Sequence, residues 1–344
     1  MANKKTPSAR KVPVTAKAGA NRRAELRAQQ EAAAKKARRN RLIIVVAIVV
    51  VVAVVASFAI WGISKVGKGS SGAINHSGTQ IMPPDGNAAK AADLTDTSNL
   101  GQAAWITVPG TTPAKSSALR LDIAFDYQCP ICKMVEDSYA KGFESLANSG
   151  DITLNMHNLT FLDNAYPNFS STRAAIAAAC VDYADNTLFY AYNNTVFTNQ
   201  PATEGAGYTD QQLTVDFPAS IGLTGDALAK FNTCYSTGQT YDWVTNVEQN
   251  NVNPVADASG TPAFLYGSDS KMYVNPSDPN NTVYYDDPSK GNQVGIPGTP
   301  TMFVNGKPMT LNNLFTFDSN NNPTPVIGTD AASILALLQQ IANS

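Results

Sequence analysis

The chain has 344 residues and a formal net charge of −2, with 15% charged and 43% hydrophobic residues. This length allows two or three domains, and the hydrophobic content excludes a wholly disordered chain. The charge is unevenly distributed, because residues 1–41 hold thirteen Lys and Arg against Glu25 and Glu31, a net of +11 that leaves −13 for the rest. Such asymmetry indicates a basic tail at a membrane or a nucleic acid.

An uncharged apolar run follows the basic tail. It comprises the 22 residues from Leu42 to Ile63. At about 1.5 Å per residue, a helix of this length covers the ~30 Å hydrocarbon core of a bilayer, so we predict a transmembrane helix over 42–63. A cleaved signal peptide is the alternative, but its apolar region is about 7–15 residues long and residues 63–65 offer no good cleavage site.

The basic residues just before this run predict its orientation. They are Lys35, Lys36, Arg38, Arg39 and Arg41. Because positive charge stays on the cytoplasmic side, residues 1–41 are predicted to be a cytoplasmic tail of a single-pass cell-membrane protein, with residues 64–344 extracytoplasmic. Attraction to anionic membrane lipid accounts for the tail, so no nucleic-acid partner is expected.

Residues 64–100 are rich in Gly, Ser, Asn and Asp, which predicts a flexible tether. The pattern of residues 101–344 predicts one α/β domain. Strands are expected over 105–108, 119–125, 152–158 and 302–304. Helices are expected over 129–148 and, at the end of the chain, over 330–342.

Two insertions interrupt this α/β pattern. Short helical segments over about 169–250 predict an all-helical subdomain. A second, polar stretch of about 254–293 is rich in Tyr, Asn, Asp, Pro and Ser and is expected to be a surface insertion. A lid, a partner surface and a loop without a role all remain open for this second insertion.

Two of the four cysteines form a Cys-Pro-Ile-Cys motif between a predicted strand and a predicted helix. Cys129 stands at the start of the helix, where unpaired N–H groups and the helix dipole stabilise an anion. Its thiolate should therefore be favoured, and the thiolate is the species that acts in disulfide exchange. Cys132, one turn further on, can close the disulfide or resolve a mixed disulfide, so both residues are predicted to be catalytic.

A zinc half-site and an inert structural disulfide are the alternatives for this motif. Zinc requires a second pair of ligands. The two histidines are His76, in the predicted tether, and His157, in a predicted strand, and the other cysteines are single. We therefore expect no metal and no cofactor, and we interpret His157 as an ordinary strand residue.

Two segments resemble the signatures of DsbA-like thioredoxin-fold disulfide oxidoreductases of the membrane-anchored actinobacterial type. Residues 125–133, FDYQCPICK, resemble the active-site segment of that family. Residues 295–307, GIPGTPTMFVNGK, resemble the segment in which a Thr-Pro bond is cis and faces the active-site disulfide. The resemblance covers roughly residues 100–344. It implies a thioredoxin fold with an inserted all-helical subdomain, in which Thr299 and Pro300 bind substrate backbone beside Cys129.

A second Gly-Thr-Pro, ending at Pro262, competes with Pro300 for this role. Pro300 is preferred because the predicted strand after it leads into Asn305-Gly306, a strong hairpin signal, and a terminal helix follows. The chain also departs from the family at two positions. Its cysteines enclose Pro-Ile where strongly oxidising relatives carry Pro-His, and Ile123 stands where a buried acid is often found.

The resemblance also implies a structural disulfide and a set of partners. Relatives of this layout carry one disulfide across the helical insertion, which here is Cys180–Cys234; two separate buried thiols are the alternative. The implied function is an oxidase for reduced or unfolded secreted and envelope proteins. The implied redox partner is a membrane protein such as a vitamin K epoxide reductase-like oxidase. A disulfide reductase or isomerase and a non-catalytic thioredoxin-like binding module for envelope proteins are the alternative functions.

Overall fold

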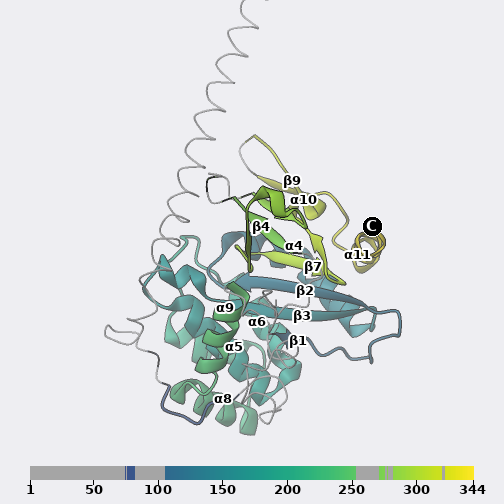
Figure 1. Ribbon diagram of the computed structural model, residues 1–344. Coiled ribbons are helices and arrows are strands. Elements are labelled where there is room, and N and C mark those ends of the chain that lie inside the picture. The colour runs from purple at the N-terminus through teal and green to yellow at the C-terminus, as the bar shows by residue number, and fades with distance from the viewer. Residues whose placement is uncertain are drawn as a thin grey trace, which may run out of the picture. The chain divides into compact units, whose positions relative to one another are not determined.

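The computed structural model describes residues 74, 76–81, 105–252, 271–275, 277, 282–319 and 322–344. A five-stranded sheet in the order β1-β3-β2-β7-β8 lies at the centre of the domain (Figure 1). Its strands are β1 (Ile106–Thr107), β2 (Leu119–Asp126), β3 (Ile152–Leu159), β7 (Thr301–Val304) and β8 (Lys307–Met309). Strands β2 and β3 are parallel, whereas the other neighbouring pairs are antiparallel. With one helix between β2 and β3 and another near the C-terminus, this is the predicted thioredoxin-like α/β arrangement.

Alternation along the strands gives the two faces of this sheet different chemistry. In β2, Leu121, Ile123 and Phe125 share one face, and Asp122 and Ala124 share the other, because successive side chains of a strand point to opposite faces. The three apolar residues are at most 2% exposed and belong to the main hydrophobic core. The core therefore lies on the face of the sheet that carries them.

Helices α4 (Pro130–Asn148) and α11 (Ala331–Asn343) contribute to this core and contact each other. Gly142 allows the two helices to approach closely, since a Cβ at this position would collide with the Ile334 side chain. The Tyr139 hydroxyl donates a 2.7 Å hydrogen bond to the Leu314 carbonyl, which fixes α4 to the segment before α11. Helix α4, which begins at the Cys-Pro-Ile-Cys motif, is thus packed against the chain on both sides of these contacts.

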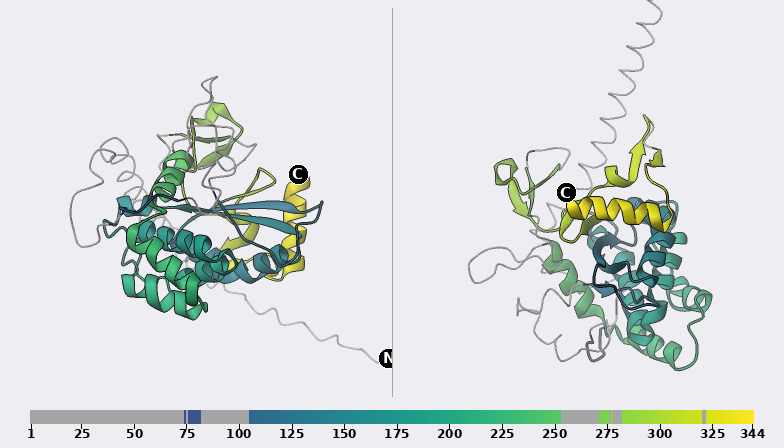
Figure 2. Two further views of the ribbon diagram at one scale, coloured as in Figure 1. Left: turned by 90° about the horizontal axis from the view of Figure 1, so that it is seen from below. Right: turned by 90° about the vertical axis from the view of Figure 1, so that its right-hand side faces the viewer.

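The predicted helical insertion lies between β3 and β7. Its helices are α5 (Ser170–Ala184), α6 (Phe189–Thr198), α7 (Phe217–Ser220), α8 (Gly225–Thr237) and α9 (Tyr241–Val252), with the short helices η1 (Phe161–Asn164), η2 (Asn186–Leu188) and the π-helical η3 (Gln212–Asp216). Figure 1 and the left view of Figure 2 show α8 and α9, in green, on the other side of the domain from α11, in yellow. Helix α5 is buried along most of its length. Its run of alanines leaves room for α6, α8 and α9 to pack around it.

A disulfide joins Cys180 of α5 to Cys234 of α8. The two Cα atoms are 5.7 Å apart and the two residues are 54 positions apart in the chain. Both side chains are fully buried. The bond therefore links the central helix of the insertion to one of the helices that cover it.

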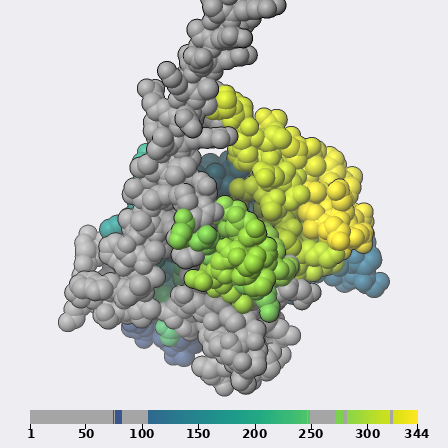
Figure 3. Space-filling view, turned by 45° about the horizontal axis from the view of Figure 1, so that its top comes forward, coloured from purple at the N-terminus to yellow at the C-terminus, as the bar shows by residue number. Residues whose placement is uncertain are grey.

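The described part of the second insertion folds as a small sheet. Strands β4 (Met272–Val274), β5 (Val283–Tyr285) and β6 (Asn292–Val294) pair antiparallel in the order β5-β4-β6, with the turn η4 (Pro288–Lys290) between the last two. Met272 packs with Ile296 and with Ala124, Leu159 and Phe303 of the central sheet. Figure 3 shows this green segment at the surface beside the yellow C-terminal part of the chain. The stretch expected to be a polar surface insertion thus covers part of the second face of the central sheet.

The chain after β7 contains two hairpins. The first turns at Asn305 and Gly306, whose φ angles of 49° and 81° are the positive values that the predicted Asn-Gly hairpin requires. The second pairs β9 (Phe315–Phe317) with β10 (Pro323–Pro325), and the short helix α10 (Leu311–Leu314) precedes it. These hairpins connect the central sheet to α11.

Residues 76–81, inside the segment expected to be a tether, pack against the turn between α8 and α9. We call these six residues the strap. The Gly78 and Ile81 N–H groups donate to the carbonyls of Thr237 and Gln239, at 3.0 and 2.8 Å. His76 stacks on Tyr241, with ring centroids 4.9 Å apart. At least this part of the predicted tether is therefore bound to the domain.

Several predicted features lie outside the described residues. They are the basic tail 1–41, the transmembrane helix 42–63, most of the tether 64–100 and the competing Pro262. Among the helices that the structure does describe, none combines the length and the apolar character needed to cross a bilayer.

Changing both Cys180 and Cys234 to Ala is expected to lower the free energy of unfolding by up to ~4 kcal/mol, because the bond closes a long loop in the unfolded chain. Denaturant unfolding followed by circular dichroism measures this loss. The reactivity of Cys129 towards a thiol reagent serves as the control and should stay close to that of the wild type. An unchanged unfolding midpoint would show that the bond does not stabilise the fold.

Candidate active site

The N-terminus of α4 positions the first cysteine. Strand β2 ends at Asp126, and Cys129 is the N-cap residue of α4, with φ −75° and ψ 117°. The Cys132 N–H donates a 3.4 Å hydrogen bond to Cys129 Sγ, so the sulfur takes the place of a capping oxygen. Pro130 follows as the first helical residue, where its missing N–H costs little.

Both cysteines of the motif are free thiols and are largely buried. Cys129 is 6% exposed and Cys132 is 2% exposed. Ile131 between them is 37% exposed. A protein substrate would therefore meet Ile131 and the small exposed part of Cys129, while Cys132 remains protected.

The segment predicted to bind substrate lies directly against Cys129. The Thr299–Pro300 peptide bond is cis. Cys129 Sγ donates a 3.4 Å hydrogen bond to the Thr299 carbonyl, across 170 positions of the chain. Pairing of Thr301 with Ala124 places this segment next to the end of β2. The structure thus brings together all four predicted residues, Cys129, Cys132, Thr299 and Pro300.

The two thiols have opposite acidities. The hydrogen bond from the Cys132 thiol is the main cause that lowers the pKa of Cys129, with smaller contributions from the Thr299 side chain and the N–H groups of Cys132 and Ile131, against the effect of burial. Burial, followed by the hydrogen bond to Cys129, raises the pKa of Cys132 well above its ordinary value. Of the two thiols, Cys129 is therefore the one that more readily forms a thiolate, and Cys132 the one that more readily keeps its proton.

Residues of the helical insertion hold the backbone around Cys129. Gln200 Nε2 donates to the carbonyls of Tyr127 and Cys129, at 2.8 and 3.1 Å. The Tyr208 hydroxyl also donates to the Tyr127 carbonyl, at 2.9 Å. No motif marks Gln200 or Tyr208 in the sequence, and both were missed there because their role depends on a contact more than 70 residues away in the chain.

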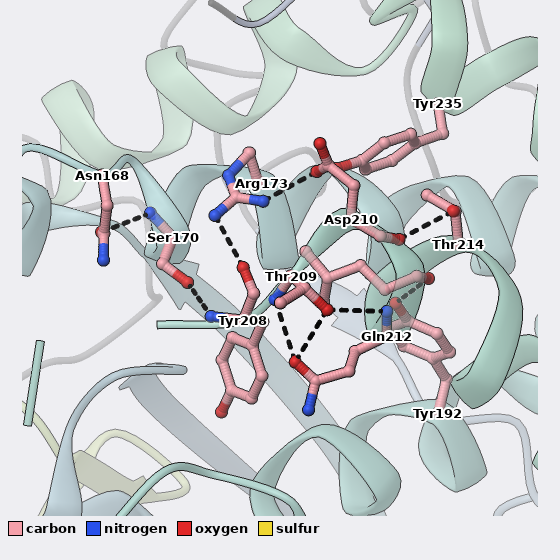
Figure 4. Close-up of polar contacts among 11 residues, drawn as sticks. Asn168, Ser170, Arg173, Tyr192, Tyr208, Thr209, Asp210, Gln212, Thr214 and Tyr235 are labelled. Carbon is pink, nitrogen blue, oxygen red and sulfur yellow. Dashed lines mark hydrogen bonds and ion pairs between the residues drawn. The ribbon is translucent and has the colours of Figure 1, made fainter. Parts of the chain in front are cut away.

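Figure 4 shows how Tyr208 is itself held. Arg173 of α5 donates to the Tyr208 carbonyl at 2.8 Å and forms an ion pair with Asp210 at 2.7 Å. The Tyr208 N–H donates to Ser170 Oγ at 2.7 Å. Helix α5 thereby fixes the loop that carries the hydroxyl to the active-site turn.

Buried carboxyl groups surround this part of the fold. Burial, with the neighbouring Asp163 carboxylate, raises the pKa of Asp126 well above its ordinary value. Burial also raises the pKa of Asp163 to about 6, of Glu248 to about 7 and of Glu136 to about 8. Ile123, at the position where the family that the sequence resembles often has a buried acid, lies in the core. Asp126, three residues before Cys129, is the buried acid nearest to the motif in the chain.

The zinc alternative has no ligand set among the described residues. Within the described part of the chain, no three His, Cys, Asp or Glu side chains are close enough together to hold a metal ion. His157 lies fully buried on β3, with its Nε2 3.4 Å from Asp122 Oδ1 and its ring 5.2 Å from that of Trp105.

Fold and site together define a thioredoxin-type domain with a Cys-Pro-Ile-Cys dithiol opposite a cis-proline loop. Residues 115–283 match the family model described as thioredoxin. This match agrees with the predicted thioredoxin-like fold.

Solved structures with a similar fold include three from actinobacteria. MdbA of Actinomyces oris, a thiol-disulfide oxidoreductase, is 19% identical, with 69% of this chain and 88% of that chain covered and a TM-score of 0.44. Reduced DsbA of Mycobacterium tuberculosis is 16% identical, with 70% of this chain and 93% of that chain covered and a TM-score of 0.43. MdbA of Corynebacterium diphtheriae is 17% identical, with 59% of this chain and 88% of that chain covered and a TM-score of 0.39. No curated protein matches the chain.

We expect Glu136→Gln to remove part of the pH dependence of stability. The pKa of Glu136 is about 8 in the fold, against roughly 4.3 in an unfolded chain. Between these values the folded chain keeps a proton that the unfolded chain has released, so its stability falls as the pH rises. At about 1.4 kcal/mol per pKa unit, the variant should therefore be more stable than the wild type by up to ~5 kcal/mol at the upper end of this range and similar to it at the lower end.

Urea unfolding at the two ends of this pH range measures the difference. Glu144→Gln, the same substitution on the same helix, controls for the loss of a negative charge from α4. A stability difference that is the same at both pH values would contradict the expectation.

Proposed function

We propose that this chain is an extracytoplasmic oxidase that transfers its Cys129–Cys132 disulfide to reduced secreted or cell-envelope proteins. The observation that carries the proposal is the unequal pair of thiols at the start of α4. The pKa of Cys129 is lowered and that of Cys132 is raised, and Cys129 Sγ lies 3.4 Å from the Thr299 carbonyl.

The exchange proceeds in two steps. A substrate thiolate attacks Cys129 of the oxidised pair; the Cys129–Cys132 bond breaks, and Cys132 leaves as a thiolate and takes up a proton. A second substrate thiolate then attacks the substrate sulfur of the mixed disulfide and releases the Cys129 thiolate. The substrate loses two electrons and gains a disulfide, and the enzyme becomes a dithiol.

The lowered pKa of Cys129 supports the oxidase over a reductase, an isomerase or a non-catalytic binding module. Stabilising the Cys129 thiolate stabilises the reduced form of the enzyme, and this raises the reduction potential of the pair. The group released in the second step is that same thiolate, and a thiol of lower pKa leaves faster. Both effects favour donation of the disulfide to a substrate.

The cis-proline loop supports a protein substrate. The backbone of Thr299 lies beside the nucleophilic sulfur, where main-chain hydrogen bonds could align an extended substrate segment as in strand addition. Thr299 and Pro300 are thus proposed as the substrate-binding residues. The dithiol must then be reoxidised, for which we propose a membrane-bound disulfide partner of the vitamin K epoxide reductase-like class.

The proposed location rests on the sequence and on the second disulfide. The apolar run 42–63, preceded by five basic residues, supports a single-pass anchor in the cell membrane with the N-terminus in the cytoplasm. The Cys180–Cys234 bond agrees with an oxidising compartment outside that membrane, where disulfides persist.

The oxidase activity is tested with a reduced, unfolded protein whose refolding requires disulfides. We expect the oxidised chain to restore its activity, Cys129→Ser to abolish this, and Cys132→Ser to accumulate mixed disulfides with the substrate. Equilibration with glutathione should give a reduction potential higher than that of glutathione. Full activity of Cys129→Ser would contradict the catalytic role, and a potential below that of glutathione would favour the reductase.

The proposed topology is tested by adding protease to protoplasts of cells that express the chain. We expect digestion of the domain beyond residue 64 and protection of the basic tail, each followed with an epitope tag at the corresponding end. A domain that becomes sensitive only after lysis would place the cysteines on the wrong side of the membrane for this function.

A further inference from the structure

Gln128, the residue immediately before Cys129, is held at both its backbone and its side chain. Its N–H donates to Asp126 Oδ1 at 2.8 Å. Its side-chain Nε2 donates to Asp163 Oδ1 at 3.0 Å and to Ser171 Oγ at 2.9 Å. Gln128 is 3% exposed, so these bonds are shielded from water.

Ser171, in the first turn of α5, contacts the same two carboxyl groups, but with the partners of its backbone and its side chain exchanged. Its N–H donates to Asp163 Oδ1 at 2.9 Å, and its hydroxyl donates to Asp126 Oδ1 at 2.6 Å. Gln128 and Ser171 therefore each give a backbone N–H to one carboxyl group and a side-chain donor to the other. The Leu162 and Thr172 N–H groups donate to the remaining oxygens, so that each carboxyl group accepts three hydrogen bonds.

This arrangement joins the active-site turn to the helical insertion through the buried Asp126 and the half-buried Asp163. Asp126 and Ser171 have no exposed surface, and burying like charges together raises the pKa of Asp126 well above its ordinary value. Replacing buried ionic groups by well-packed apolar residues is often neutral or stabilising, so stability alone is a weak reason for such a pair. Hydrogen bonds to carboxylates do, however, fix geometry strongly.

We propose that Gln128 and Ser171, bridged by the Asp126–Asp163 carboxyl pair, form a brace through which the helical insertion sets the position of Cys129. This inference rests on the proposed thiol–disulfide exchange and assigns positioning residues to it. The four side chains act by positioning Cys129.

The brace acts on Cys129 through one peptide unit. Cys129 Sγ has two bonds of 3.4 Å, one to the Thr299 carbonyl and one from the Cys132 N–H. Only the bond from the Cys132 N–H stabilises a thiolate, because a thiolate has no proton to donate to the Thr299 carbonyl. A rotation of the Gln128–Cys129 peptide would move the sulfur away from this N–H and weaken that bond. Without the brace, the Cys129 thiolate should be less stabilised and less often directed at an incoming disulfide.

The test uses the purified full-length chain in detergent, with Ser171→Ala and Gln128→Met. The first removes the bridging hydroxyl, and the second removes the bridging amide while keeping the backbone N–H. We measure the pKa of Cys129 from the ultraviolet absorbance of its thiolate, and the rate of exchange with oxidised glutathione. Each variant should raise the pKa of Cys129 and slow the exchange roughly tenfold, the effect of losing about one hydrogen bond to a charged group.

Thr240→Val is the matched control. Thr240 is a fully buried residue of the same insertion whose hydroxyl donates to the Ile176 carbonyl, about one and a half turns along α5 from Ser171. Its loss should lower the melting temperature but leave the pKa of Cys129 and the exchange rate as in the wild type. If Thr240→Val changes them as much as Ser171→Ala does, the effect is general destabilisation and the proposal is wrong.

The double variant Gln128→Met/Ser171→Ala separates a brace from two independent contacts. Since both residues serve one structure, the double variant should be no slower than the slower single variant. Multiplied losses, or single variants that exchange like the wild type, would overturn the brace. A wild-type chain that does not exchange with glutathione would instead refute the proposed function, while the pKa of Cys129 would still report on the brace.

Discussion

The N-terminus of α4 is the constraint on which the rest of the structure depends. A sulfur can serve as the cap of this helix only if the chain turns sharply at the end of β2 and enters the helix within three residues. The central sheet fixes the start of that turn, and the packing of Gly142 against Ile334 fixes the helix beyond it. The antiparallel partner β7 then brings the Thr299 carbonyl to the same sulfur. Two distant segments thus meet at Cys129 because each is bound to β2.

The helical insertion is as much a support as a cover. Its centre is α5, whose alanines admit other helices on several sides and whose first turn reaches the residues before Cys129. Gln200 and Tyr208 from the following loops bind the Tyr127 carbonyl. The disulfide between α5 and α8 lies in this same group of helices. The active-site turn therefore has partners in the sheet on one side and in the insertion on the other.

The local features of this chain were predictable from its sequence, and the long-range polar contacts were not. The elements around Cys129, the hairpin at Asn305 and the helical block follow from periodicity and turn chemistry, which act over a few residues. The contact between Asp126 and Ser171 spans 45 positions and has no periodic signature. The small sheet was missed because its three-residue strands are too short to show alternation among polar loops.

The strap has a consequence for where the enzyme can work. If residues 42–63 anchor the chain as proposed, a fully free tether up to residue 100 would let the domain lie as far as ~130 Å from the bilayer. Because the chain is already attached to the domain at Gly78 and Ile81, the segment from residue 63 to residue 78 can extend only about 50 Å. This segment also joins the domain at the α8–α9 turn rather than near the cysteines. The domain would then stay within a layer of about this depth over the membrane, through which newly exported chains pass.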